Sequence, residues 1–157
     1  MQRTRGMDIS SRTRANDEAS GATLDRLLRL AGARKSKPVA LVDGTVDDLI
    51  ELYRRGYRQV ALMRQPPRGT DDADAVVLDG SGTLAEIAET LTRFRPLLER
   101  AEILVVRRER GDGEPPARGL WRLLAARGFT PMLQIGARSN FVMLARRVDR
   151  GGAAQAA

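Results

Sequence analysis

The stretch DAVVLDGSGTLAEI at residues 74–87 repeats the plan of VALVDGTVDDLI at residues 39–50. Each stretch begins with a short apolar run, passes through Asp-Gly to a small hydroxyl residue, and ends in a pattern typical of an amphipathic helix. Apolar runs without alternation indicate strands buried on both faces, as in a parallel sheet. The two copies therefore predict two strand-to-helix units of one sheet, with Asp43 and Asp79 at the carboxyl ends of their strands.

The rest of the chain alternates in the same way. Beyond the strands at 38–43 and 74–79, we expect strands at 59–63, 102–106, 131–136 and 140–147, and helices at 22–33, 45–56, 83–98 and 117–127. Pro96 should kink or end the third helix, and the paired prolines keep 64–73 from being helical. The last two strands are close enough to form a hairpin. The sequence thus predicts an α/β protein, a three-layer α/β/α Rossmann-like sandwich, with a mostly parallel sheet ending in an antiparallel hairpin.

Helical spacing also predicts which side chains face the core. The expected inward residues are Leu24, Leu27, Leu28 and Leu30 in the first helix, Val46, Leu49, Ile50 and Tyr53 in the second, Leu84, Ile87, Ala88, Leu91, Phe94 and Leu98 in the third, and Leu120, Trp121, Leu123 and Leu124 in the last. Phe129, which follows the helix-ending Gly128, is also expected in the core. The alternative for Trp121, that it stacks on a nucleic-acid base, stays open.

The composition excludes several kinds of site. The chain of 157 residues has no cysteine and no histidine, so it has no disulfide, no thiolate nucleophile, no His-dependent catalytic triad and no His-based zinc site. No metal site is predicted. The net charge is +7, and only Lys35 and Lys37 among the basic residues are lysines. Two explanations of this surplus of arginine stay open: the codon bias of a GC-rich genome, and a surface that binds polyanions.

The ends of the chain differ from its middle. Residues 1–21 lack apolar periodicity and are expected to be a disordered, arginine-containing tail; 22–149 form the α/β domain, and 150–157 are a second disordered tail. Neither a membrane-spanning run nor an apolar signal core is found, so a cytoplasmic location is expected. The arginine-rich surface suggests a protein or nucleic-acid partner and no membrane, and the oligomeric state stays open.

One short motif resembles that of a phosphatase family. DGSGTL at 79–84 is similar to the first motif of the haloacid-dehalogenase phosphatases, and the resemblance implies Asp79 as nucleophile. However, Ser81 stands where most members have a second aspartate, and no paired acidic motif for magnesium follows downstream.

A second resemblance covers residues 38–147. The order of elements is similar to that of the class I S-adenosylmethionine-dependent methyltransferases, which end in a helix, a Gly-Phe turn and an antiparallel hairpin. LWRLLAARGFTPMLQIGARSNFVMLARR (120–147) resembles that ending, and ADAVVLDGSGTLAEIAETLTRFRPLLERAEILVVRR (73–108) resembles the family's middle strand, long helix and next strand. The resemblance implies a cofactor site at the strand ends, with candidate cofactor-binding residues Asp43, Gly44, Asp79 and Gly80.

The chain departs from the family where the cofactor would bind. Gly44 alone stands in place of a glycine-rich turn, and the second strand ends in Met63 and Arg64 in place of the acid that holds the ribose. Only the ten residues 64–73 replace a helix, a strand and another helix. We therefore expect no bound cofactor and assign no catalytic residue.

These observations leave three hypotheses for function. The first is a reduced, non-catalytic methyltransferase-like domain that acts as a binding or accessory module. The alternatives are an active small methyltransferase with an atypical S-adenosylmethionine site, and a basic accessory protein associated with nucleic acid. Asp43 and Asp79 are then either turn residues beside helix caps at Thr45 and at Ser81 or Thr83, or a close pair of carboxylates able to hold a magnesium ion.

Overall fold

The computed structural model describes residues 22–68, 72–108, 117–137 and 140–148. The two predicted tails lie outside these ranges, so the tails and the domain limits 22–149 remain predictions. The described helices are α2 (Ala22–Leu30), α3 (Val46–Arg54), α4 (Leu84–Arg93), α5 (Arg95–Leu98) and α6 (Ala117–Ala126). The strands are β1 (Val39–Val42), β2 (Val60–Met63), β3 (Ala75–Asp79), β4 (Ile103–Arg108), β5 (Phe129–Ala137) and β6 (Asn140–Arg147). No helix in the described part of the chain is long and apolar enough to cross a membrane.

The six strands form one sheet in the order β2-β1-β3-β4-β6-β5. β1 pairs in parallel with both β2 and β3, and β3 pairs in parallel with β4. β6 runs antiparallel to both of its neighbours, β4 and β5. The predicted parallel sheet with a closing antiparallel hairpin is therefore confirmed.

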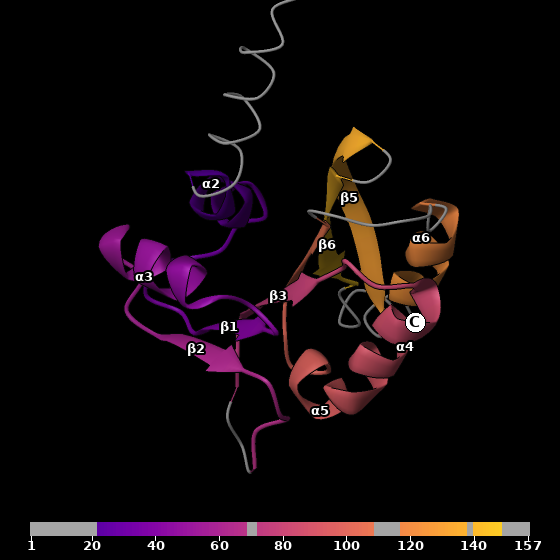
Figure 1. Cartoon of the computed structure of the whole chain (residues 1–157), viewed down its shortest axis with the longest axis horizontal. Helices are drawn as coiled ribbons and strands as arrows, with labels where there is room; N and C mark the ends of the chain where they lie inside the picture. Colours follow the sequence, from indigo (N-terminus) through magenta and orange to yellow (C-terminus); the bar gives the residue numbers. More distant parts are fainter. Residues whose placement is uncertain (1–21, 69–71, 109–116, 138–139, 149–157) are drawn as a thin grey trace, which may run out of the picture.

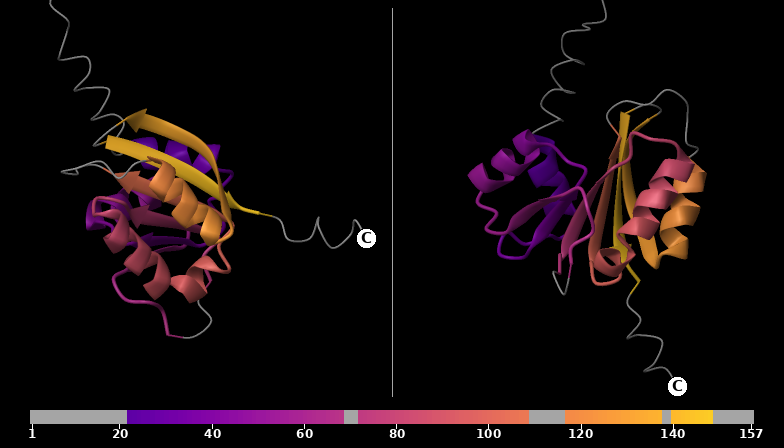
Figure 2. Two further views of the ribbon diagram at one scale, coloured as in Figure 1. Left: turned by 90° about the vertical axis from the view of Figure 1, so that its right-hand side faces the viewer. Right: turned by 60° about the horizontal axis from the view of Figure 1, so that its bottom comes forward.

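Helices cover both faces of this sheet, as Figures 1 and 2 show. Alternate residues of each buried strand point to opposite sides, so Leu41 packs beneath α2 and α3 while Val42 packs beneath α4, α5 and α6. The apolar runs of the strands thus contribute side chains to two separate hydrophobic cores, one on each face of the sheet. The three-layer α/β/α sandwich is confirmed.

The break between α4 and α5 lies where Pro96 predicted it. α4 ends at Arg93, and α5 begins at Arg95 with Pro96 in its first turn. Proline has no amide hydrogen and its ring clashes with the preceding turn, so it is tolerated only at such a start. Phe94, between the two helices, is fully buried, and the expected inward face of this segment is confirmed at Ile87, Leu91 and Leu98.

The inward face of α3 was predicted wrongly at three of its four positions, and only Leu49 packs against the core as expected. Val46, Ile50 and Tyr53 are 57%, 42% and 49% exposed, whereas Leu52, which was not expected in the core, is fully buried. The apolar stripe of α3 is wide, and the helix packs with the edge of the stripe that carries Leu49 and Leu52 against the sheet. Tyr53 instead reaches the edge strand β2, where its hydroxyl donates a hydrogen bond to the carbonyl of Val60 at 3.1 Å.

Two further expected core residues, Leu30 and Trp121, are exposed to 53% and 49%. α6 buries Leu120 and Leu124, one turn apart, and Trp121 lies on the next face of the helix. Phe129 is 1% exposed, which confirms its assignment to the core. The prediction for Trp121 was wrong because it placed this residue on the stripe of Leu120 and Leu124, whereas consecutive helical residues point about 100° apart.

Candidate functional site

The carboxyl ends of β1 and β3 meet at one small cavity. Val42 and Leu78 are paired across the two strands, so Asp43 and Asp79 follow at adjacent positions. The chain leaves β1 toward β2 on one side, and β3 and β4 extend the sheet on the other. Open α/β sheets bind their ligands at such a point. The cavity has a volume of about 70 Å³ and is lined by Leu41, Val42, Asp43, Gly44, Thr45, Asp48, Val77, Leu78, Asp79, Ser81 and Arg107.

The structure thus brings the predicted site residues together at this cavity, which we call the strand-end cleft. Asp43, Gly44 and Asp79 line it directly. Gly80 does not line it, because its amide donates a 2.8 Å hydrogen bond to the carbonyl of Arg107. A Cβ atom on Gly80 would lie 2.8 Å from Cγ1 of Val106, so packing against β4 already requires a glycine there.

Asp43 has an unusual backbone conformation. Its φ is +52°, in the left-handed region that most residues avoid and that aspartate tolerates better than most. Its amide donates a 2.9 Å hydrogen bond to the carbonyl of Met63 at the end of β2. The turn after β1 is therefore tied to the neighbouring strand end, and the Asp43 side chain projects to the surface side of the cleft, where it is 44% exposed.

Asp79 is engaged within its own turn. Its Oδ1 accepts hydrogen bonds from the amide of Ser81 at 3.0 Å and from the Ser81 hydroxyl. This arrangement is the side-chain turn that aspartate commonly makes after a strand. Helix caps follow both aspartates: Thr45 accepts from the amide of Asp48, and Thr83 accepts from the amide of Glu86, each at 3.2 Å. The predicted turn and cap roles are present at both strand ends.

Two arginines from other elements form ion pairs with two of the three carboxylates of the cleft. Arg107, on β4, lies 2.6 Å from Oδ2 of Asp48, and both side chains are only 13% exposed. Arg93, on α4, lies 3.3 Å from Oδ2 of Asp43. Of the four residues in these two ion pairs, the sequence analysis proposed only Asp43 as a site residue. Arg107 could have been found from the alignment of β4 with β3, which places it opposite Asp79 at the carboxyl end of the strand.

The acidic residues of the cleft do not make a metal centre. Within the described ranges, no group of three or more aspartate or glutamate side chains is placed to hold a metal ion. A magnesium ion takes near-octahedral oxygen coordination and is usually held through one or two carboxylates. Here Asp43 pairs with Arg93 and Asp48 pairs with Arg107. A cation at this place would compete with two guanidinium groups for the same oxygens.

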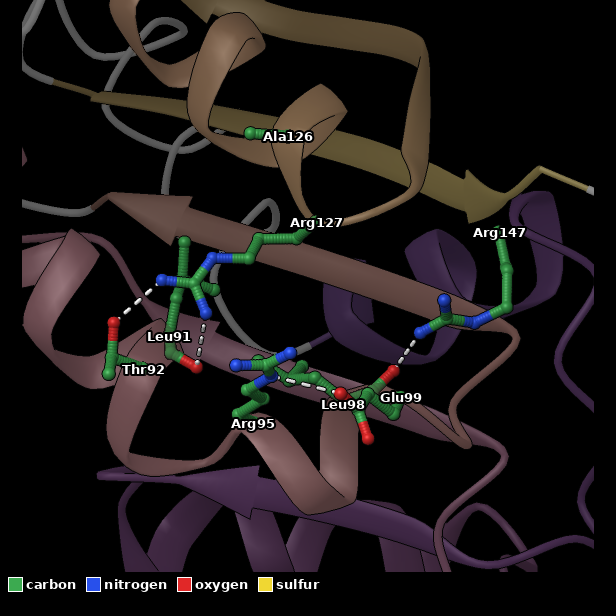
Figure 3. A pocket seen from close by; sticks show the side chains of 8 residues that line it. All are labelled: Leu91, Thr92, Arg95, Leu98, Glu99, Ala126, Arg127 and Arg147. Atoms are coloured by element: carbon green, nitrogen blue, oxygen red, sulfur yellow. Dashed lines mark hydrogen bonds and ion pairs between the residues drawn. The ribbon is translucent and has the colours of Figure 1, made fainter.

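A second, larger cavity of about 450 Å³ lies between α4, α5 and the turn after α6 (Figure 3). Of its three arginines, Arg95 pairs with Glu99 at 2.9 Å, and the other two bond the ends of helices. Arg127 donates to the hydroxyl of Thr92 at 2.6 Å and to the carbonyl of Leu91 at 3.5 Å. Arg147 donates to the carbonyls of Leu98 and Ala101. Because the last carbonyls of a helix have no partners within it, these contacts explain the cluster as structural.

Comparisons with known proteins find a likeness in fold and none in sequence. No protein-family model matches the chain, and no curated protein matches it in sequence. Magnesium protoporphyrin IX methyltransferase from Synechocystis PCC 6803, solved with bound SAH, is similar in structure, with a TM-score of 0.64 and 13% identity over 86% of this chain and 85% of that one.

Two other solved structures show the same likeness. One is Sp1610 from Streptococcus pneumoniae, a candidate tRNA (m1A22) methyltransferase, with a TM-score of 0.55 and 17% identity over 78% of this chain and 69% of that one. The other is HI0767 from Haemophilus influenzae, a candidate methylase, with a TM-score of 0.54 and 12% identity over 82% of this chain and 99% of that one. The chain therefore has the Rossmann-like fold of the class I methyltransferases.

Proposed function

We propose that this protein is a reduced methyltransferase-like domain that acts by binding, as an accessory module, and does not transfer methyl groups. The observation that carries the proposal is the strand-end cleft, whose volume is about 70 Å³. Pockets that enclose a small organic ligand are roughly 300–1,000 Å³. The cleft is therefore several times smaller than a cofactor of nucleoside size requires.

The side chains of the cleft also do not suit S-adenosylmethionine. The Arg107–Asp48 ion pair lies largely buried within it, and separating such a pair leaves a charge without its partner. Breaking a buried pair costs about 3–5 kcal/mol, and each 1.4 kcal/mol weakens binding about tenfold. Arg64 follows the end of β2, where a carboxylate would be needed to hold two ribose hydroxyls. The residues present do not fit the cofactor, and no chemical step is derived through it.

Titration calorimetry on the full chain tests this proposal. With S-adenosylmethionine and S-adenosylhomocysteine as separate titrants, we expect no saturable heat up to about 1 mM. A dissociation constant of about 1 mM corresponds to a binding free energy of only about 4 kcal/mol. The contrary function is an active small methyltransferase, which the likeness to a structure holding SAH favours.

Saturable micromolar binding would contradict the proposal if Asp43→Ala or Asp79→Ala abolished it with the fold intact. Asp72→Ala is the matched control, because Asp72 is an exposed aspartate paired with Arg100 outside the cleft. Circular dichroism of each variant checks that the fold survives. Binding that all three variants retained would also contradict the proposal, by placing a cofactor site elsewhere on the domain.

A further inference from the structure

The outer face of α6 carries an exposed tryptophan between two arginines. Trp121 is 49% exposed and is the only tryptophan of the chain. Together with Arg118, Arg122 and Gln134 of β5 it lines a surface depression of about 580 Å³, which we call the Trp121 face. Arg118 and Arg122 are one helical turn apart, and Trp121 lies beside them on the same side of the helix.

The charge of this face is of one sign. α6 reads ARGLWRLLAA, with two arginines and no acidic residue. Both arginine side chains are exposed, and neither stabilises a helix end or a buried carboxylate in the way that Arg147 and Arg107 do. An exposed aromatic ring beside two cations suits a ligand that is both flat and anionic.

We propose that the Trp121 face binds single-stranded nucleic acid. One base stacks on the indole ring of Trp121, Arg118 and Arg122 contact the flanking phosphates, and the side-chain amide of Gln134 donates to and accepts from the edge of the base. Every base has a π face, so stacking on an aromatic side chain tolerates any sequence. Double-stranded DNA or RNA would not offer its bases in this way, because they are stacked on one another.

The net charge of +7 agrees with a polyanionic ligand, since it attracts nucleic acid to the whole molecule. The Trp121 face lies on the α4–α6 side of the sheet, away from α2 and α3 (Figure 2). It is built from other residues than the strand-end cleft, so this inference stands or falls independently of the proposed function.

The single tryptophan makes the experiment specific to this face. The full chain is titrated with a 12-nucleotide oligothymidylate while the fluorescence of Trp121 is followed, and oligouridylate of the same length is a second arm that separates DNA from RNA. Stacking should quench the indole emission in a saturable way. The affinity should fall with salt, with a slope of log K against log [KCl] of about −1.4, as two phosphate contacts on a single strand give.

Variants assign the effect to named side chains. Binding of a labelled oligonucleotide, measured by fluorescence anisotropy, should weaken about tenfold or more in Trp121→Ala, which is the size of effect that loss of one stacked base produces. The double variant Arg118→Ala/Arg122→Ala should also bind more weakly and lose most of the salt dependence. The matched control is Arg54→Ala/Arg58→Ala, which removes the same charge from exposed arginines near α3.

Three results would overturn the inference. The first is unchanged Trp121 emission at saturating oligonucleotide, which would place any nucleic-acid site elsewhere. The second is an equal loss of affinity in the two double variants, which would mean that net charge alone binds the strand. The third is self-association of the wild type that Trp121→Ala abolishes, with no effect of this variant on oligonucleotide affinity. That result would assign the face to contact between protein molecules.

Discussion

Phe129 and Trp121 belong to the same helix–strand unit and differ in what surrounds them. Phe129 is buried in the core shared by α4, α5 and α6, and the guanidinium of Arg147 lies 4.6 Å from the centre of its ring. Trp121 projects into a depression on the surface. At the scale of single residues, the size and apolarity of a side chain therefore did not decide its burial. Its position relative to Leu120 and Leu124 did.

This difference predicts two unequal effects on stability. Phe129→Ala should lower the free energy of unfolding by about 3–5 kcal/mol, because it leaves a cavity in a packed core. Trp121→Ala should lower it by about 1 kcal/mol or less, as is usual for an exposed site. Urea denaturation of both variants measures the two values. Equal losses would show that the Trp121 side chain is packed as tightly as that of Phe129.

The two ion pairs of the strand-end cleft should also differ. Arg107→Ala leaves Asp48 without this partner in a site where both side chains were 13% exposed, and should cost about 3–5 kcal/mol. Arg93→Ala, the matched control, breaks a pair whose side chains are 41% and 44% exposed, and should cost under about 1 kcal/mol. Denaturant unfolding at low salt decides the comparison. A neutral Arg107→Ala variant would mean that the pair does not hold the cleft closed.

Tyr57 predicts how stability changes at alkaline pH. Burial, with the nearby negative charge of Asp25 as a second cause, raises the pKa of its hydroxyl above the ordinary value of about 10. Protonated Tyr57 is thus favoured in the folded state. Its contribution to stability is full below about pH 10 and is lost as the pH rises toward the folded-state pKa.

The test compares wild type with Tyr57→Phe. Between about pH 9 and pH 11 the wild type should lose about 1 kcal/mol more of its unfolding free energy than the variant does. The difference between the two proteins removes every pH effect that does not depend on the Tyr57 hydroxyl. Parallel pH profiles would show that the Tyr57 hydroxyl is as accessible in the folded as in the unfolded chain.

At the scale of elements, local signals predicted where helices and strands lie better than which way they face. Apolar runs bounded by Asp-Gly predicted β1 and β3 nearly to the residue, because burial on both faces requires them to be apolar throughout. The inward face of α3 was missed, because the helix packs with one edge of its apolar stripe, around Leu49 and Leu52, against the sheet. Which of its apolar residues is buried depends on how α3 lies on β1 and β2, and that is a tertiary property.

The threonine caps give a prediction for two of these elements. Thr45→Ala and Thr83→Ala should each lower the unfolding free energy by about 1 kcal/mol, since each removes the acceptor of an otherwise unpaired amide. Thr90→Ala is the control, because the Thr90 hydroxyl donates to the carbonyl of Glu86 inside α4 and caps no amide at the start of the helix. Thermal unfolding checks the three variants. A Thr90→Ala loss as large as the others would argue against capping.

At the scale of the whole molecule, the sequence was sufficient for the topology and insufficient for the chemistry. Strand–helix alternation predicted the parallel sheet, and the resemblance to the methyltransferase order of elements implied that β1 and β3 are neighbours; the sheet has both features. The contents of the cleft were not predictable in this way. Arg93 reaches Asp43 from a helix fifty positions along the chain, and no local pattern marks such a pair.

We propose that the class I methyltransferase-like fold is retained here while its strand-end cleft is closed to the cofactor. Site-resolved NMR tests this most directly: ¹⁵N-labelled protein is titrated with S-adenosylhomocysteine, and the amide signals of Gly44 and Gly80 are followed. We predict that neither amide signal shifts at about 1 mM ligand, because the Arg107–Asp48 pair occupies the small cavity at these strand ends and leaves no room for the ligand. Saturable shifts of both amides, centred on the ends of β1 and β3, would contradict it.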